Sequence, residues 1–254
     1  MASAPQAQNL PLFYNDLVPL SSVEHASYKG KGLDNLAMLA TTHAVPLTVE
    51  EFVIAQRSQP IVFSAGDDAL PLALYGLNEG VNMFMDENNM LQPQAYLPAY
   101  VRRYPFMLVR LQPDREDLSL CFDPSSGLLG DFEDGIPIFA DGEPSAETKA
   151  TLEFCEQFEM GVQKTIAFMN ELKEYDLLMD GEITIEQQGA SQPFIYRGFK
   201  MVDETKLRDL RGDQLRKMMQ SGMLPLVHAH LFSLQHMPTL FQRQFEAGKV
   251  QANG

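Results

Sequence analysis

Short apolar runs separated by turn-forming residues make up most of the first half of the chain. Each run is five to seven residues long, which is typical of buried strands and short for a helix. Strands are therefore expected at 43–47, 60–64, 70–76, 81–86, 106–111 and 118–122. Between the first two, Thr48 and Glu51 form the T-x-x-E pattern of a capping box, which predicts the start of a short helix. Its buried side is expected to carry Val49, Phe52 and Val53.

A helical repeat replaces this pattern after residue 145. Ser145 is expected to cap a long helix over 145–178. Apolar side chains recur in it at intervals of three and four residues: Leu152, Cys155, Phe158, Val162, Ile166, Met169 and Leu172. A hairpin with strands at 183–187 and 194–202 is expected to follow, because both runs are rich in β-branched and aromatic residues.

Three shorter helices are expected after the hairpin. Asp203 and Asp213 are placed to cap the first two, and Gly222 lies just past the end of the second. Apolar residues at helical spacing predict a last helix over 223–240. Together these elements predict an α+β fold, with a mixed or antiparallel sheet and short helices in the first half and a helical second half that contains a β-hairpin.

The whole fold is expected to form a single domain over 13–242, because no polar linker divides the two halves. A flexible arm over 1–12 and a frayed tail over 243–254 are expected to flank it. The domain is expected to consist of three parts: a sheet-rich part over 13–125, an acidic loop over 123–144 and a helix-rich part over 145–242.

The acidic character of the chain limits the partners that it can bind. Its formal net charge of −15 repels the phosphate backbone of nucleic acids and the surface of anionic membranes. Ten acidic residues lie within 114–147, where the D-x-[DN]-x-[DN]-G pattern of a calcium loop is absent, so a solvated loop is expected. No metal ion or other cofactor is expected. The expected partner is a protein, and a homo-oligomer is left open.

The distribution of basic and apolar residues predicts a cytoplasmic location. The first sixteen residues contain no Lys or Arg and no apolar segment, unlike a secretory signal peptide. No uncharged apolar run reaches the roughly 18 residues that a membrane-spanning helix needs. Cys121 and Cys155 lie far apart in the sequence and are expected to be two buried thiols. Export by a route that needs no signal peptide is left open.

Two adjacent arginines in an otherwise apolar stretch are the strongest candidates for a functional site. Residues 97–109 read LPAYVRRYPFMLV, in which Pro98 suits the first position of a helix and Pro105 ends it. Adjacent residues on a helix point about 100° apart. Only one of Arg102 and Arg103 is therefore expected to face the core.

The arginine pair has a structural and a functional interpretation. In the structural one, the inward-facing arginine forms a buried ion pair with a carboxylate such as Asp123 or Asp86. In the functional one, both arginines and Tyr104, helped by His43, form a pocket for the carboxylate or phosphate group of a ligand. A lone positive site on an acidic protein would be selective for anions.

A pair of histidines in the last expected helix is the best candidate for a metal site. His228 and His230 would share a face on a strand, but on a helix they point about 200° apart. Because a helix is expected, we interpret one of them as a core histidine that hydrogen-bonds to a neighbour. The sequence contains no signature of a catalytic nucleophile and none of a nucleotide-binding loop.

Several short strings along the chain are together more informative than any one of them. They are L-V-P-L at 17–20, T-H-A-V-P-L at 42–47, P-I-V-F at 60–63, A-L-Y-G-L at 73–77, Y-L-P-A-Y-V-R-R-Y-P-F at 96–106, G-F-K-M-V-D-E-T-K-L at 198–207, S-G-M-L at 221–224 and H-A-H-L-F-S-L at 228–234. Their order resembles the SapC family of bacterial proteins over most of the chain.

This resemblance implies a link to bacterial surface-layer, envelope or nutrient-uptake systems, and it carries no catalytic residues over. A peptide-transport permease shares the family's name, but a permease needs several membrane spans, which this sequence lacks. The expected function is therefore that of a non-catalytic accessory or interaction protein. The alternative is an enzyme or a small-ligand binding protein that uses the anion pocket at the arginine pair.

Overall fold

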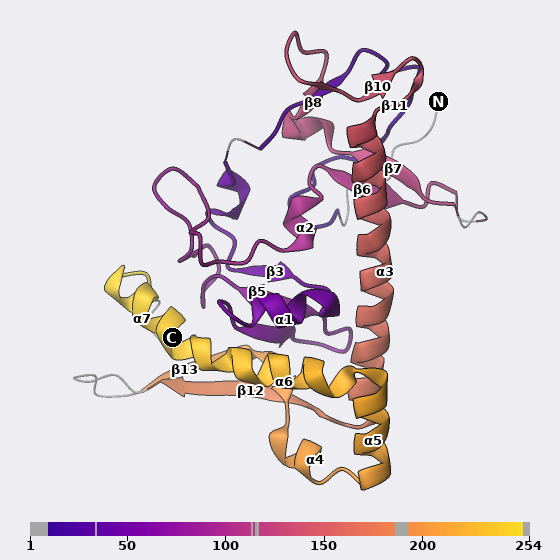
Figure 1. The fold of residues 1–254 in the computed structure, drawn as a ribbon. Helices are drawn as coiled ribbons and strands as arrows, with labels where there is room; N and C mark the ends of the chain where they lie inside the picture. Colours follow the sequence, from indigo (N-terminus) through magenta and orange to yellow (C-terminus); the bar gives the residue numbers. More distant parts are fainter. Residues whose placement is uncertain (1–9, 34, 113, 115–116, 186–192, 251–254) are drawn as a thin grey trace. The chain divides into compact units, whose positions relative to one another are not determined.

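The structure, a computed structural model, describes residues 10–33, 35–112, 114, 117–185 and 193–250 (Figure 1). Its backbone contacts divide the chain into two compact units. The first unit comprises Met1–Asp34 and Val101–Met160, and the second comprises Asn35–Tyr100 and Gly161–Gly254. Both combine helices with antiparallel strands, so the predicted α+β class is confirmed. The single domain over 13–242 stays a prediction.

The first unit contains short antiparallel strands and the beginning of a long helix. Its strands are β1 Val18–Pro19, β2 Lys29–Gly30, β6 Phe106–Val109, β7 Ser119–Phe122, β8 Leu129–Gly130, β9 Ile136–Pro137, β10 Phe139–Ala140 and β11 Glu143–Pro144. Among the described residues they form three sheets, in the orders β1–β7–β6, β8–β2–β9 and β10–β11. The segment 123–144 was expected to be a loop. It is partly strand, because β2 offers one edge to β8 and the other to β9.

The second unit is built around a larger antiparallel sheet. Its strands are β3 Ala44–Pro46, β4 Ile61–Ser64, β5 Pro71–Leu74, β12 Leu178–Ile185 and β13 Phe194–Val202. In the described part of the chain their order is β12–β13–β4–β5–β3. The expected strands at 43–47, 60–64, 70–76 and 194–202 are confirmed.

Most of the helical residues lie in the C-terminal half of the chain. Among the described residues the helices are η1 Ala37–Leu39, η2 Val49–Glu51, α1 Phe52–Ala55, α2 Ala99–Arg102, η3 Pro124–Ser126, α3 Ala146–Glu174, α4 Glu204–Arg208, α5 Gly212–Ser221, α6 Met223–Ser233, η4 Leu234–His236 and α7 Met237–Glu246, where η marks a 3-10 helix. Residues of α2 and α3 belong to both units. None of the helices in the described residues is long and apolar enough to cross a bilayer.

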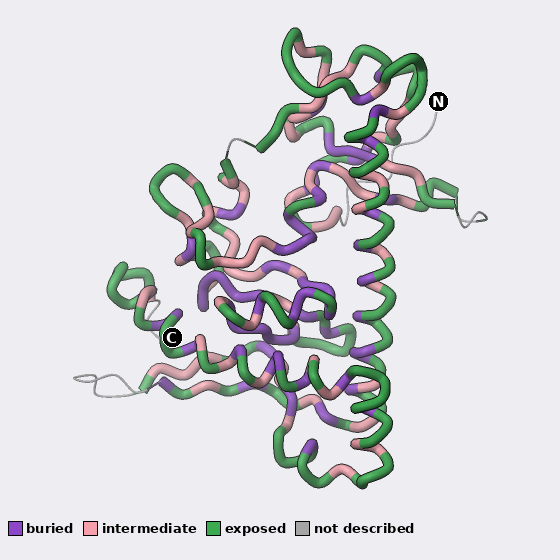
Figure 2. The backbone as a smooth tube through the Cα atoms, viewed as in Figure 1, coloured by how far each residue is buried: buried purple, intermediate pink, exposed green. Residues whose placement is uncertain are grey.

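Helix α6 packs against strands β4 and β13 of this sheet and against α1 (Figures 1 and 2). The ring of Phe63 on β4 lies 4.6 Å from the His230 ring on α6 and 6.3 Å from the Phe168 ring on α3, measured between centroids. Phe168 also contacts Phe52 of α1 edge to face. Burial of these aromatic rings stabilises the unit, since each removes a large apolar area from water.

The buried carboxylate of Glu51 joins η2 to the start of α2 and to Tyr96 just before it. Glu51 Oε2 accepts hydrogen bonds from the backbone N–H and the hydroxyl of Thr48, at 2.8 and 3.0 Å. Its Oε1 accepts from the Tyr96 hydroxyl at 3.0 Å and from the Ala99 backbone N–H at 2.7 Å. The bond back to the Thr48 backbone confirms the role predicted for Glu51. The contacts with Tyr96 and Ala99 arise from tertiary structure.

Two expectations in the first half of the chain are wrong. Residues 81–86 form no strand, and Met85 makes a single bridge to Leu91. The buried Asn82 side chain accepts from the Phe84 backbone N–H at 2.8 Å and so turns the chain locally. Val53 is exposed. The helix there begins with a 3-10 turn, whose tighter period rotates this position outward.

The long helix is shorter than predicted and the strand after it is longer. Ser145 caps α3 by accepting from the Thr148 backbone N–H at 3.1 Å, as expected. The helix ends at Glu174, and Asp176 takes a left-handed conformation with φ of 51°. Strand β12 then begins before the predicted segment 183–187, because it pairs with β13 along nearly its whole length. Ile166, predicted to be buried, is exposed.

The C-terminal helices differ from prediction at their ends. Asp203 caps α4, and Gly222 ends α5 with φ of 79°, as expected. The N-cap of α5 is Arg211, whereas Asp213 lies in the first turn and forms an ion pair with it. The single helix predicted over 223–240 is interrupted by η4, and α7 continues to Glu246. Residues 1–9 of the predicted arm and 251–254 of the predicted tail lie outside the described residues.

Candidate functional site

The two adjacent arginines point in different directions, as predicted. They lie at the end of α2, and Pro105 follows them before β6 begins. Arg103 is buried, whereas Arg102 is exposed and stacks over the Phe154 ring, with its Cζ 5.1 Å from the ring centre. The local pattern of prolines and apolar residues therefore holds one guanidinium inside the first unit and leaves the other at its surface.

Arg103 is held by residues of the long helix. Its Nη1 lies 3.5 Å from Glu159 Oε1, and its Cζ lies 4.2 Å from the centre of the Phe158 ring. The sequence pattern favoured Asp123 or Asp86 as the partner and did not point to Glu159. Burial raises the pKa of Glu159 above its ordinary value, and the nearby Arg103 acts in the opposite direction. Asp123, one of the predicted partners, accepts from the backbone N–H groups of Asn15 and Ser125.

Removing the Arg103 side chain is expected to destabilise the protein far more than removing Arg102. The Arg103→Ala variant loses a buried ion pair and a ring contact, which should cost about 2 kcal/mol because Glu159 keeps some access to water. The exposed Arg102→Ala change should cost less than about 0.5 kcal/mol. Thermal unfolding followed by circular dichroism measures both. A melting temperature lowered equally by the two changes would contradict this assignment.

Both arginines and Tyr104 line one cavity of the first unit. The cavity has a volume of about 470 Å³. Its other lining residues are Gly30, Lys31, Gly32, Leu33, Pro105, Phe106, Leu128, Leu129, Ile136, Ile138, Glu147, Thr148, Ala150, Thr151 and Phe154. His43 was expected to help this site, but it belongs to the second unit and is not among the residues that line the cavity.

Sequence reasoning missed Lys31 as a member of this site. The residue lies in the Y-K-G-K-G stretch at 28–32, which reads only as a turn. In the structure its Nζ lies 3.9 Å from the centre of the Phe132 ring. Nothing in the local sequence connects this lysine to an arginine about seventy residues away, because pairing of β2 with β8 and β9 places it there.

The two histidines of α6 do not form a metal site. His228 is exposed and His230 is fully buried, as the divergence of alternate residues on a helix predicts. Within the described residues, no cluster of three or more histidine, cysteine, aspartate or glutamate side chains is arranged to hold a metal ion. The prediction that one of the two is a core histidine bonded to a neighbour is confirmed.

His230 fills a gap in the sheet of the second unit. Strands β13 and β4 pair Phe199 with Ser64, and the same antiparallel register would place Val202 opposite Ile61. The imidazole lies between this last pair. The Val202 N–H donates to Nε2 at 3.1 Å, so Nδ1 carries the proton and donates to the Ile61 carbonyl at 2.8 Å. Burial lowers the pKa of His230 to about 4, which keeps the ring neutral.

The two thiols are buried, as predicted. Cys121 lies in β7 and Cys155 in α3, and both are free. Burial raises the pKa of each thiol to about 11. Neither group is a ready nucleophile near neutral pH, because the thiolate is the reactive form.

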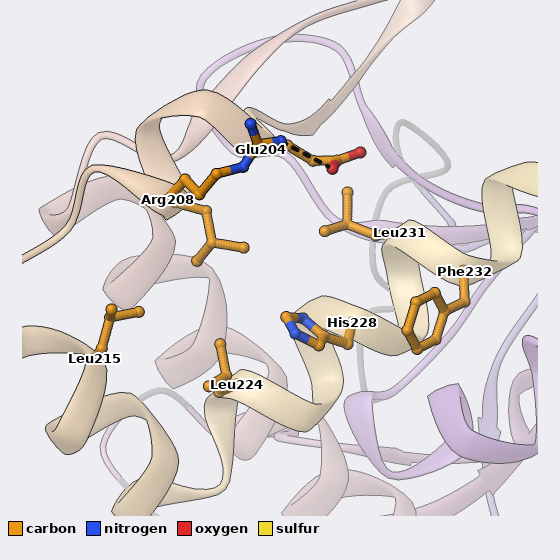
Figure 3. A pocket seen from close by; sticks show the side chains of 8 residues that line it. Glu204, Arg208, Leu215, Leu224, His228, Leu231 and Phe232 are labelled. Atoms are coloured by element: carbon orange, nitrogen blue, oxygen red, sulfur yellow. Dashed lines mark ion pairs between the residues drawn. The ribbon is translucent and has the colours of Figure 1, made fainter.

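An apolar pocket opens between α4, α5 and α6 of the second unit (Figure 3). Its volume is about 490 Å³. Five apolar side chains line it: Leu207, Leu215, Leu224, Leu231 and Phe232. His228 also points into it, and the ion pair between Glu204 and Arg208, with 3.8 Å between Oε2 and Nη2, lies beside it. Phe232 is 60% exposed, which is unusual for a large aromatic side chain.

Comparison with known proteins gives a family match. The sequence model described as SapC matches residues 20–240, which is most of the chain. No curated protein and no solved structure matches the chain. The family match agrees with the order of short strings in the sequence, and it assigns no activity to particular residues.

Proposed function

The chain belongs to the SapC family, and on this premise we propose that it is a non-catalytic accessory protein that binds a protein partner. The observation that carries the proposal is the apolar pocket at α4–α6, in which Phe232 stays exposed. Contiguous apolar side chains at a protein surface are typical of interaction sites. The link to surface-layer, envelope or nutrient-uptake systems rests on the family resemblance and is part of the proposal.

Buried polar groups of both units are occupied by hydrogen bonds within the fold, which supports a role without catalysis. Glu51 accepts four hydrogen bonds within the second unit, and both ring nitrogens of His230 bond to strands. Asp123 accepts from two backbone N–H groups in the first unit. Each of these groups serves the architecture. The net charge of −15 favours a partner whose contacting surface is basic. The pocket favours an apolar side chain of the partner at the centre of that surface.

Placing a charge in the pocket should abolish partner binding. Phe232→Asp is expected to weaken capture of a specific partner from native lysate by at least about tenfold, because a carboxylate cannot be buried against an apolar side chain. Val23→Asp is the matched control, since Val23 is 85% exposed and lies in the first unit. Affinity capture with quantitative mass spectrometry identifies the partner, and titration with the purified partner confirms the loss.

Two results would contradict the proposed function. One is a protein capture by Phe232→Asp that equals capture by the wild type and by Val23→Asp. The other is stoichiometric metal in the purified protein, found by elemental analysis, together with turnover of a substrate.

A second candidate function is the binding of a small anion in the first unit. The observation that favours it is the cavity of about 470 Å³, in which Lys31, Arg102 and Arg103 gather within a strongly acidic chain. A concave site with one sign of charge raises the local concentration of ligands of the opposite sign. Tyr104 lines the same cavity and offers a hydroxyl group. His43 is not part of this proposal.

A further inference from the structure

The cavity of the first unit combines positive charge with an aliphatic surface. The side chains of Leu129 and Ile138 are buried and belong to its lining. Leu33 and Ile136 line it as well, yet they are 39% and 51% exposed. Large aliphatic side chains left partly in water beside a cavity mark a surface that a ligand can cover.

The charged lining of this cavity is predominantly positive. Lys31, Arg102 and Arg103 line it together with one acidic residue, Glu147. Arg103 also forms an ion pair with Glu159. Lys31 and Arg102 each lie over an aromatic ring, and this contact fixes the position of the cationic group. The net charge of the whole chain is negative, so this cavity is a local site that attracts anions.

We propose that this cavity binds an amphipathic anion, with its head group at Lys31 and Arg102 and an unbranched aliphatic chain along the leucine and isoleucine side chains. The inference rests on the second candidate function and adds the chemical class of the ligand. A guanidinium group bonds a carboxylate or a phosphate with the same fork of N–H donors. Each methylene buried against aliphatic side chains should tighten binding about fourfold.

Isothermal titration of the full chain with four probes tests the ligand class. The probes are acetate, octanoate, octyl phosphate and octanol. Octanoate or octyl phosphate is expected to bind one per chain, at least about a hundredfold more tightly than acetate, because several methylenes become buried. Octanol should bind at least about tenfold more weakly than the tighter anion, since it lacks the charge. The ratio of octanoate to octyl phosphate affinity shows which head group the site selects.

Two matched variants locate the site. Arg102→Ala should weaken binding of the tighter octyl anion by about tenfold and leave octanol binding nearly unchanged, since only the head group loses a contact. Arg110→Ala removes another exposed arginine of the first unit that does not line the cavity, so affinity should stay at the wild-type value. Because both arginines are exposed, both variants should fold, and circular dichroism verifies this.

Each outcome has a defined meaning. Equal affinity for acetate and the octyl anions would overturn the aliphatic part of the inference and leave anion binding in place. Equal affinity for octanol and the octyl anions would overturn the role of charge. Absence of binding by all three anions would overturn both the inference and the second candidate function. Binding that survives Arg102→Ala unchanged would overturn the location of the head group.

Discussion

Replacing His230 with alanine is expected to lower the free energy of unfolding by about 4 kcal/mol at pH 7.5. The change empties a fully buried volume and leaves the Val202 N–H and the Ile61 carbonyl without the ring that joins them. Each effect alone costs about 1–3 kcal/mol. Urea denaturation of the wild type and the variant measures the difference.

The control for this variant lies two residues away on the same helix. His228 is exposed, so His228→Ala should change the free energy of unfolding by less than about 0.5 kcal/mol. Equal losses for His228→Ala and His230→Ala would show that the two rings are equivalent, and the bridge between β13 and β4 would then contribute nothing to stability.

The pH dependence of unfolding provides an independent signature of this bridge. Burial lowers the pKa of His230 from its ordinary value of 6.5 to about 4 in the folded protein. As pH falls below 6.5 the unfolded chain takes up a proton that the folded protein does not, so stability decreases until about pH 4. The total loss should be about 3 kcal/mol. The gap between wild type and His230→Ala should therefore narrow over this range, and a gap that stays constant would disprove the neutral bridge.

Replacing Glu51 with alanine is expected to lower the free energy of unfolding by about 4 kcal/mol. The variant leaves the backbone N–H groups of Thr48 and Ala99 and the Tyr96 hydroxyl without their acceptor inside the second unit. An unsatisfied buried donor costs about 1–3 kcal/mol. Urea denaturation at pH 7.5 provides the measurement.

Two further variants show whether the carboxylate itself is needed. Glu50 is exposed and forms an ion pair with Lys164, so Glu50→Ala should cost no more than about 1 kcal/mol. Glu51→Gln keeps the shape but replaces one oxygen by an NH₂ group. Because each oxygen of Glu51 accepts from two donors, the NH₂ group would face donors, and the loss should still exceed about 2 kcal/mol. A Glu51→Gln variant as stable as the wild type would refute this account.

Local physical chemistry allowed several parts of the fold to be predicted. A cap depends on one side chain and the backbone two or three residues away, so Ser145 and Asp203 were predicted correctly. The predictions for Val53 and for the strand at 81–86 failed for a related reason. A 3-10 turn or a side chain bonded to its own backbone changes the direction of the chain without changing its apolar pattern.

The candidate sites were only partly predictable. That only one of Arg102 and Arg103 faces inward follows from the helical angle between neighbours, whereas the structure shows that Arg103 is the buried one. The carboxylate at Arg103 is Glu159, fifty-six residues further along the chain, and no local pattern distinguishes it from the other acidic residues. Lys31 could not be assigned for the same reason, because sheet pairing brings it to the cavity.

By itself the sequence determined most of the secondary-structure segments, the family, the acidic net charge and the identity of the side chains that could carry charge into the interior. Periodicity and capping are properties of neighbouring residues, so they can be read without knowing the fold. Only the tertiary structure decided that His230 replaces a missing link between β13 and β4 and that Lys31 lies with Arg102 in one cavity. These arrangements depend on strand register and on contacts between residues far apart in the chain, which local sequence does not encode.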